Sequence, residues 1–338
     1  MFKIISLLFL ILVNSLAGAT VATSVGFSPE IGIIVANAVS LIPRGVSGAL
    51  FAGLNKEIWL ADIMEAFIPN RAFLSAVTNM DQFVDNDKIN LADAGVDPNV
   101  LINNTSYPVA MAARSDTALE FVLDVYDTEG TVIRNAELAE LAYDKRSSVV
   151  AQHKSALLTK FSQKAIHAYA PASNATNTPV LPTSGGASGG FKMITFQDIL
   201  DLKTAYDNID APEDRVIVLN PRHFNELSKQ DLTLMKAILQ GNEKLYGFQI
   251  FTFSKTPAFN KSTGAKVAWG ATPAPTTDTI ASVSFCTSEV MRALGTFKMF
   301  ETLNDPREKG DIVSFQMRGV ALPKRGKGIG AIYSIAST

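Results

Sequence analysis

The side chains of this sequence that could carry chemistry are few and far apart. There is one cysteine, Cys286, and there are three histidines, at positions 153, 167 and 223. No two of the histidines combine with a cysteine or a carboxylate at the spacing of metal ligands. A single cysteine cannot form an intrachain disulfide, so stability does not depend on an oxidising compartment. Cys286 lies in an apolar stretch, which is typical of a buried, unreactive thiol.

Three short segments approach known catalytic or ligand-binding motifs, and each departs from its motif. Residues 45–49 read Gly-Val-Ser-Gly-Ala and lack the final glycine of a nucleophile elbow. Residues 85–89 begin like a calcium loop but place Ile89 where an acidic or amide side chain is needed. The glycine-rich residues 185–190 are not followed by the Gly-Lys-Ser/Thr of a phosphate-binding loop. We therefore expect no catalytic residue, no metal site and no cofactor, and we expect that the protein is not an enzyme.

A small basic cluster near the carboxy terminus is the remaining candidate site. It comprises Arg318, Lys324, Arg325 and Lys327. Basic side chains contact nucleic-acid phosphates without regard to base sequence, so this cluster is a candidate DNA-facing surface. A solvated loop is the alternative interpretation. The net charge of the chain is −2, so bulk positive charge does not attract it to nucleic acid.

Composition and the amino terminus both indicate apolar surface that something else must cover. Hydrophobic residues make up 47% and charged residues 18% of the 338 residues, which is apolar-rich for a soluble monomer. The first residues follow the plan of a signal peptide, with Lys3, an apolar run from Ile4 to Val13, and a possible cleavage site at residues 17–19. That run is too short to predict a membrane span. A cleaved export signal and an apolar arm that packs on neighbouring chains both stay open.

Periodicity predicts the elements of the first half. Residues 55–67 favour a short amphipathic helix, which Pro69 ends. Residues 80–126 begin polar and turn-rich and end in a period-two strand pattern, which predicts a long, irregular β-hairpin. Its tip has too few bulky residues to bury itself, so we expect it to lie on a neighbouring chain. Residues 135–169 favour a helix of roughly 50 Å with Asn135 as its N-cap, and the histidines on it are expected to be solvated or partly packed.

The second half reads as a mixed module followed by strands. A flexible stretch at 171–190 leads into residues 195–275, where Thr195 can cap one helix and Asn220-Pro221 can open another. An apolar strand, Val216–Leu219, lies between these helices. Four further strands are predicted, at 281–286, 297–303, 311–322 and 329–335.

The order of these elements resembles that in the major capsid proteins of tailed bacteriophages. Three stretches carry the resemblance, most convincingly between about Asn55 and Leu322. The stretches are Tyr126–Glu129 with Ile133–Glu137 and Glu140–Lys145, then Val218-Leu219-Asn220-Pro221, then Gly310–Phe315 with Arg318. The first of these stretches is similar to the strand-to-helix junction in capsid proteins from phages and prophages of Bacteroidetes-type bacteria.

The resemblance implies an α+β fold of the Hong Kong 97 kind, with an N-terminal arm, an extended β-hairpin loop, a long spine helix, and peripheral and axial domains. The late strands are expected to complete the peripheral sheet. The implied boundaries are 1–54 for the apolar arm or signal-like segment, 55–79 for the N-terminal helix of the arm, 80–133 for the extended hairpin loop, 134–190 for the spine helix and linker of the peripheral domain, 191–295 for the axial domain, and 296–338 for the closing strands of the peripheral domain.

The function that the resemblance implies is structural. Copies of the chain would form hexamers and pentamers of an icosahedral shell around double-stranded DNA, in a virion assembled in the host cytoplasm. Further partners would be the packaged DNA, contacted non-specifically through the basic cluster, and portal, decoration or scaffold proteins. A bacterial compartment shell of the encapsulin kind and an exported surface protein with a cleaved signal peptide are the alternatives.

Overall fold

The computed structural model of the chain describes residues 72–93, 100, 102–105, 107–108, 117–134, 145–241 and 244–337. The predicted helix at 55–67 and the predicted N-cap Asn135 lie outside these residues. The signal-like amino terminus also lies outside them, so an export signal and an apolar arm remain two interpretations. Among the described helices, none combines the length and the apolar character needed to cross a membrane.

A six-stranded sheet organises the larger α+β unit. Its strands follow the order β11-β10-β13-β16-β7, and β12 pairs with β13. Every residue of β10 and of β16 is buried, as expected for strands inside a sheet that is covered on its faces. The strands are β7 (Val180–Pro182), β10 (Arg215–Leu219), β11 (Phe248–Thr252), β12 (Ala258–Asn260), β13 (Asp278–Cys286) and β16 (Ile329–Tyr333).

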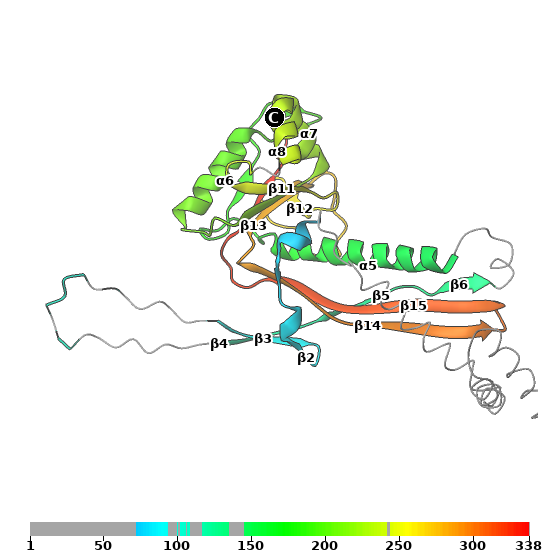
Figure 1. Ribbon diagram of the computed structural model, residues 1–338. Coiled ribbons are helices and arrows are strands. Elements are labelled where there is room, and N and C mark those ends of the chain that lie inside the picture. The colour runs from blue at the N-terminus through cyan, green and yellow to red at the C-terminus, as the bar shows by residue number, and fades with distance from the viewer. Residues whose placement is uncertain are drawn as a thin grey trace, which may run out of the picture. The chain divides into compact units, whose positions relative to one another are not determined.

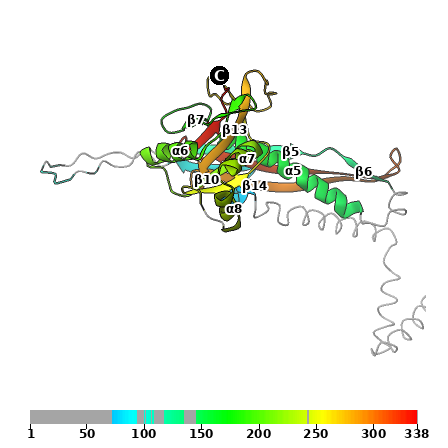
Figure 2. The same cartoon turned by 90° about the horizontal axis from the view of Figure 1, so that it is seen from above.

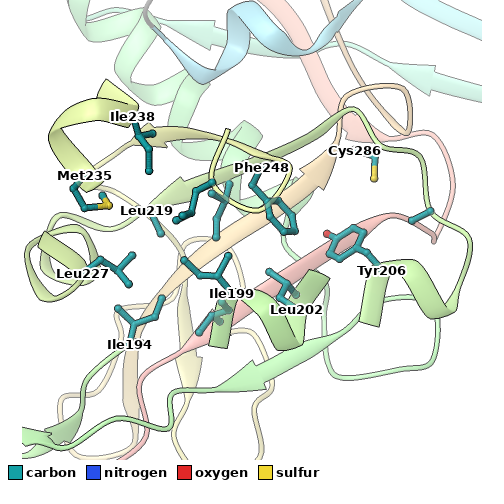
Figure 3. Close-up of a cluster of buried hydrophobic side chains, with 14 residues drawn as sticks. Ile194, Ile199, Leu202, Tyr206, Leu219, Leu227, Met235, Ile238, Phe248 and Cys286 are labelled. Carbon is teal, nitrogen blue, oxygen red and sulfur yellow. The ribbon is translucent and has the colours of Figure 1, made fainter. Parts of the chain in front are cut away.

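Three helices pack against this sheet, and their caps agree with the sequence. They are α6 (Phe196–Asn208), α7 (Pro221–Gln230) and α8 (Leu232–Gly241). Thr195 forms a capping box with Asp198 at the start of α6, and the Asn220 side chain accepts from the backbone N–H of Arg222 at the start of α7. Both predicted caps are confirmed. Figure 3 shows side chains from all three helices meeting Leu219 and Phe248 of the sheet in one apolar core.

A second, five-stranded sheet carries the long helix α5 (Lys145–Tyr169). Its order is β1-β14-β15-β5, and β6 also pairs with β15. Val149, His153, Leu157 and Phe161 are buried at four-residue intervals, so one stripe of α5 faces the sheet. Both views show α5 running beside β15 (Figures 1 and 2). The strands are β1 (Thr78–Asn79), β5 (Asp124–Asp127), β6 (Thr131–Arg134), β14 (Val290–Asp305) and β15 (Gly310–Pro323).

The predicted hairpin is present but shorter than expected. β3 (Lys88–Asp93) pairs antiparallel with β4 (Thr117–Val122), and β2 (Val84–Asp85) pairs with the start of β3. Residues 124–134 belong elsewhere, because β5 and β6 pair with β15 of the five-stranded sheet. The period-two pattern continues through this change of partner, so it could not reveal where the hairpin ends.

Other expectations about the elements need correction. The described end of the segment predicted as an arm helix, residues 73–79, forms the 3-10 turn η1 (Phe73–Ala76) and strand β1. A second such turn, η2 (Asp81–Phe83), follows, and β8 (Ala187–Ser188) with β9 (Phe191–Lys192) forms a small hairpin. The last strand, β16, does not join the closing strands of the five-stranded sheet, because it lies between β13 and β7.

Two of the connections between the two sheets lie side by side, and we call this place the junction. Residues 287–289 lead from β13 into β14, and residues 324–328 lead from β15 back into β16. The two turns bond to each other, with Cys286 N–H donating to Gly328 O and Lys324 N–H to Glu289 O, both at 2.8 Å. The end of α5 closes over them, where the buried Tyr169 hydroxyl donates to Met291 O at 3.0 Å.

Gly330 in β16 offers a test of this central strand. A Cβ at Gly330 would lie 2.9 Å from Ser284 Oγ and 3.0 Å from both Pro179 O and the Tyr206 hydroxyl oxygen. We expect Gly330→Ala to lower the free energy of unfolding by about 1–3 kcal/mol, because a packed interior resists added volume. Gly326→Ala is the control, since nothing lies within 4 Å of its Cβ. Urea unfolding of both variants with equal midpoints would contradict this packing.

Candidate interaction surfaces

The base of the hairpin is anchored firmly to the five-stranded sheet. Ile89 of β3 is fully buried against Leu123, Ala293 and Val320. Arg318 of β15 forms an ion pair with Asp87 in the turn between β2 and β3. The base therefore folds with the body of the subunit.

The tip of the hairpin has the opposite character. Ile102 is 85% exposed and Tyr107 is 79% exposed. Residues 98–113 contain no charged side chain. Exposed apolar side chains such as these are typical of a surface that another molecule covers.

A groove lies between α5 and the strands β5 and β6. Its volume is about 730 Å³. Ala156 and Leu157 of α5, Val125 and Tyr126 of β5, and Trp269 supply its apolar lining. Lys160, Lys164, Asp124, Asp127 and Glu129 also line it, and Lys164 pairs with Asp124 at 2.7 Å.

His153 lines this groove with an unused hydrogen-bonding atom. The residue is only 7% exposed, and its ring lies 5.1 Å from that of Phe315. Its Nε2 has no hydrogen-bond partner among the described residues. Burial lowers the pKa of His153, so its neutral form is favoured. The sequence had suggested a solvated or partly packed histidine, and only the packing of α5 on β15 reveals this buried one.

A loop after β12 ties the end of α5 to the six-stranded sheet. The Lys266 ammonium donates to His167 O at 2.8 Å and to Ala170 O at 2.5 Å. It thus satisfies carbonyls that the helix end leaves unpaired. His167 Nε2 donates to Val267 O at 2.8 Å, and Trp269 contacts the His167 ring edge-on. Trp269 lies at the end of the groove and also lines a smaller pocket of about 200 Å³.

The four residues of the predicted basic cluster are not brought together. Arg318 is occupied by Asp87 at the hairpin base, whereas the other three lie in the turn of the junction. There the Lys324 ammonium donates to Ser288 O at 2.7 Å, and burial lowers its pKa while the carboxylates of Glu289 and Asp214 oppose this. The turn is therefore of mixed charge, and DNA contact stays a prediction.

The remaining candidates for chemistry are buried. Cys286 is inaccessible, as predicted, and burial raises the pKa of its thiol to about 12. His223 is fully buried, with Nδ1 and Nε2 each 2.7 Å from a hydroxyl, of Ser282 and Ser334 respectively. No sequence pattern predicts this network, because His223, Ser282 and Ser334 lie far apart in the chain. Among the described residues, no cluster of histidine, cysteine or carboxylate side chains could hold a metal ion.

Comparisons with known proteins identify the fold. No family model matches the sequence, and no curated protein matches it. Solved structures do match: a chain from the capsid of the cyanophage P-SCSP1u has a TM-score of 0.55 at 18% identity, covering 78% of this chain and 87% of that chain. A chain from the capsid of Ralstonia phage GP4 has a TM-score of 0.57 at 9% identity, covering 78% and 88%. A chain from a virus-like particle of Pyrococcus furiosus has a TM-score of 0.52 at 9% identity, covering 82% and 99%. The α+β fold is therefore the Hong Kong 97-like fold of phage capsids, as predicted.

The His223 network predicts a pH dependence of stability. Burial, with a smaller contribution from Arg222, lowers the folded-state pKa of His223 to about 4, against about 6.5 in an unfolded chain. The neutral His223 therefore contributes its full stabilisation above pH ~6.5. As the pH falls from there toward 4, the free energy of unfolding decreases, by up to about 1.4 kcal/mol per pH unit.

The control for this effect is His223→Gln, which cannot acquire the charge. Urea unfolding at pH 7, 6, 5 and 4 should show the difference in stability between the native chain and the variant shrinking as the pH falls. A stability difference between the two chains that stays constant from pH 7 to pH 4 would show that His223 does not titrate as its burial requires.

Proposed function

We propose that this chain is the major capsid protein of a tailed bacteriophage, and that its copies assemble into an icosahedral shell around double-stranded DNA. The observation that carries the proposal is the match of about four-fifths of the chain to chains from phage capsids. The resemblance of residues 126–145 to capsid proteins from phages and prophages of Bacteroidetes-type bacteria is part of the proposal.

The two exposed features of the subunit support assembly. Residues 98–113 carry no charge, and the base of the hairpin packs on the five-stranded sheet. The exposed Ile102 and Tyr107 therefore need an external surface to cover them. The groove beside α5 offers apolar lining and the unpartnered Nε2 of His153. In this proposal the hairpin of one copy overlaps its neighbour at the groove, which makes the contact head-to-tail and able to close into rings of five or six.

The proposed domains follow the two sheets more closely than the boundaries from the sequence. The axial domain comprises the six-stranded sheet and α6–α8, including β7 and β16, which the boundary at 191–295 leaves out. The peripheral domain comprises α5 and the five-stranded sheet, whose strand β14 begins at Val290, before the boundary at 296. Axial domains would converge at the centre of each ring.

The other partners and the location are also part of the proposal. Packaged DNA would be met by non-specific contacts, for which Arg318, Lys324, Arg325 and Lys327 are candidates, although Arg318 would have to leave Asp87. Portal, scaffold or decoration proteins would complete a virion whose shell assembles in the host cytoplasm.

Removing the hairpin tip tests the proposal. Deletion of residues 85–118 would also remove the buried Ile89, so we delete residues 94–116 instead. Asp93 and Thr117 pair with each other in the hairpin, and an Asn-Gly turn can join them. We expect this variant to keep its unfolding midpoint and to lose shell closure in negative-stain images. Thr105→Ser, within an intact tip, is the control and should assemble normally. Shells of normal size from the shortened chain would refute the role of the tip.

Filling the groove tests the other side of the same contact. Ala156 is exposed and lines the groove, whereas the neighbouring Ser155 is exposed and does not line it. We expect Ala156→Trp to reduce the assembled fraction, measured by size-exclusion chromatography with light scattering, at least tenfold. Ser155→Trp should leave it unchanged, and both should keep their stability within ~0.5 kcal/mol. Equal assembly by the two variants would place the contact elsewhere.

A further inference from the structure

Among the described residues, no strand pairs with the outer edge of β14 over the middle of the strand. β1 pairs with β14 only at Met291 and Arg292, and the Asp81 carboxylate then accepts the N–H of Leu294 at 2.7 Å, which ends the pairing. From Lys298 to Thr302, β14 pairs residue by residue with β15 on its inner side. On its outer side this stretch has no strand partner among the described residues.

This edge is only partly protected against pairing with another strand, because the charged Lys298 and Glu301 alternate with uncharged side chains and the stretch has no proline. Proteins usually protect an edge with charges, prolines or bulges. Here the register shifts flank the open stretch and leave the stretch itself regular. At its centre Phe300 is 52% exposed, with the exposed side chains of Lys298 and Thr302 on either side on the same face.

The sequence of the open stretch is compatible with pairing to itself. In an antiparallel pair related by a two-fold axis, opposite residues share a face, so the axis passes through a residue position. An axis at Phe300 places the two Phe300 rings together and Lys298 opposite Thr302 of the second copy, and an aromatic pair of this kind is favourable. An axis at Glu301 would place two carboxylates opposite each other, and an axis at Met299 would place Lys298 opposite Phe300.

We propose that β14 is an interaction surface for β14 of a second copy of this chain, paired antiparallel across a two-fold axis at Phe300. The contact goes beyond the proposed function. The hairpin-and-groove contact is head-to-tail and makes rings, whereas this contact is isologous and joins two subunits from different rings. A closed shell needs contacts between rings as well as within them.

A cysteine at position 300 tests the pairing directly. The chain has one native cysteine, Cys286, and it is buried, so only an introduced thiol is accessible for disulfide formation. Opposite residues of an antiparallel pair have Cβ atoms about 4.5–5.5 Å apart, close enough for a disulfide after a small adjustment. We expect Phe300→Cys in the full chain to form a disulfide-linked dimer under mild oxidation, as seen on non-reducing gels.

Lys298→Cys is the matched control. Its two copies would be separated by about four residues along the strand, or roughly 14 Å, which is too far for a disulfide. A mixture of Lys298→Cys and Thr302→Cys chains should instead form the mixed dimer, because these positions face each other. Equal crosslinking of the two single variants, or none in Phe300→Cys and none in the mixture, would overturn the proposal.

Phe300→Asp separates this proposal from the proposed function. Phe300 is half-exposed, so the variant should keep its unfolding midpoint, while two like charges at the axis would oppose the pairing. We expect rings without closed shells in negative-stain images. Normal shells from Phe300→Asp would overturn the β14 contact and leave the proposed function intact. A native chain that forms neither rings nor shells would instead refute the proposed function.

Discussion

The junction between the two sheets is the constraint on which the rest of the structure depends. Its two turns are held to each other by main-chain hydrogen bonds, and the Asp214 carboxylate accepts from the hydroxyls and one N–H of Thr287 and Ser288. Tyr169 at the end of α5 packs on Phe285, with both side chains fully buried. Covalent connections, hydrogen bonds and apolar packing therefore coincide at the junction and hold the two sheets together there.

That arrangement determines which surfaces are left incomplete. The core of the six-stranded sheet is covered by its own helices, and α5 covers one face of the five-stranded sheet. Among the described residues, three places stay uncovered: the apolar side chains of Ile102 and Tyr107, the groove with its unpartnered histidine, and the outer edge of β14. Each is suited to an extended segment of protein.

The sequence predicted the local features of the fold well. The helix caps at Thr195 and Asn220, the strand Val216–Leu219 and the α+β class follow from short-range patterns, and the structure confirms them. The partner of a strand is a long-range property, so the pattern could not show that residues 124–134 leave the hairpin or that β16 joins the other sheet. The basic cluster shows the same limit, because Arg318 is paired with Asp87, 231 positions away.

The central claim is that this subunit is completed only by copies of itself. Sedimentation velocity of the purified full chain, over a range of protein and salt concentrations, tests it most directly. The account predicts a concentration-dependent shift from one chain to rings and larger closed particles. A kosmotropic salt such as sulfate should strengthen the shift, because the proposed contacts bury apolar side chains. A single boundary at the mass of one chain under every condition would contradict it.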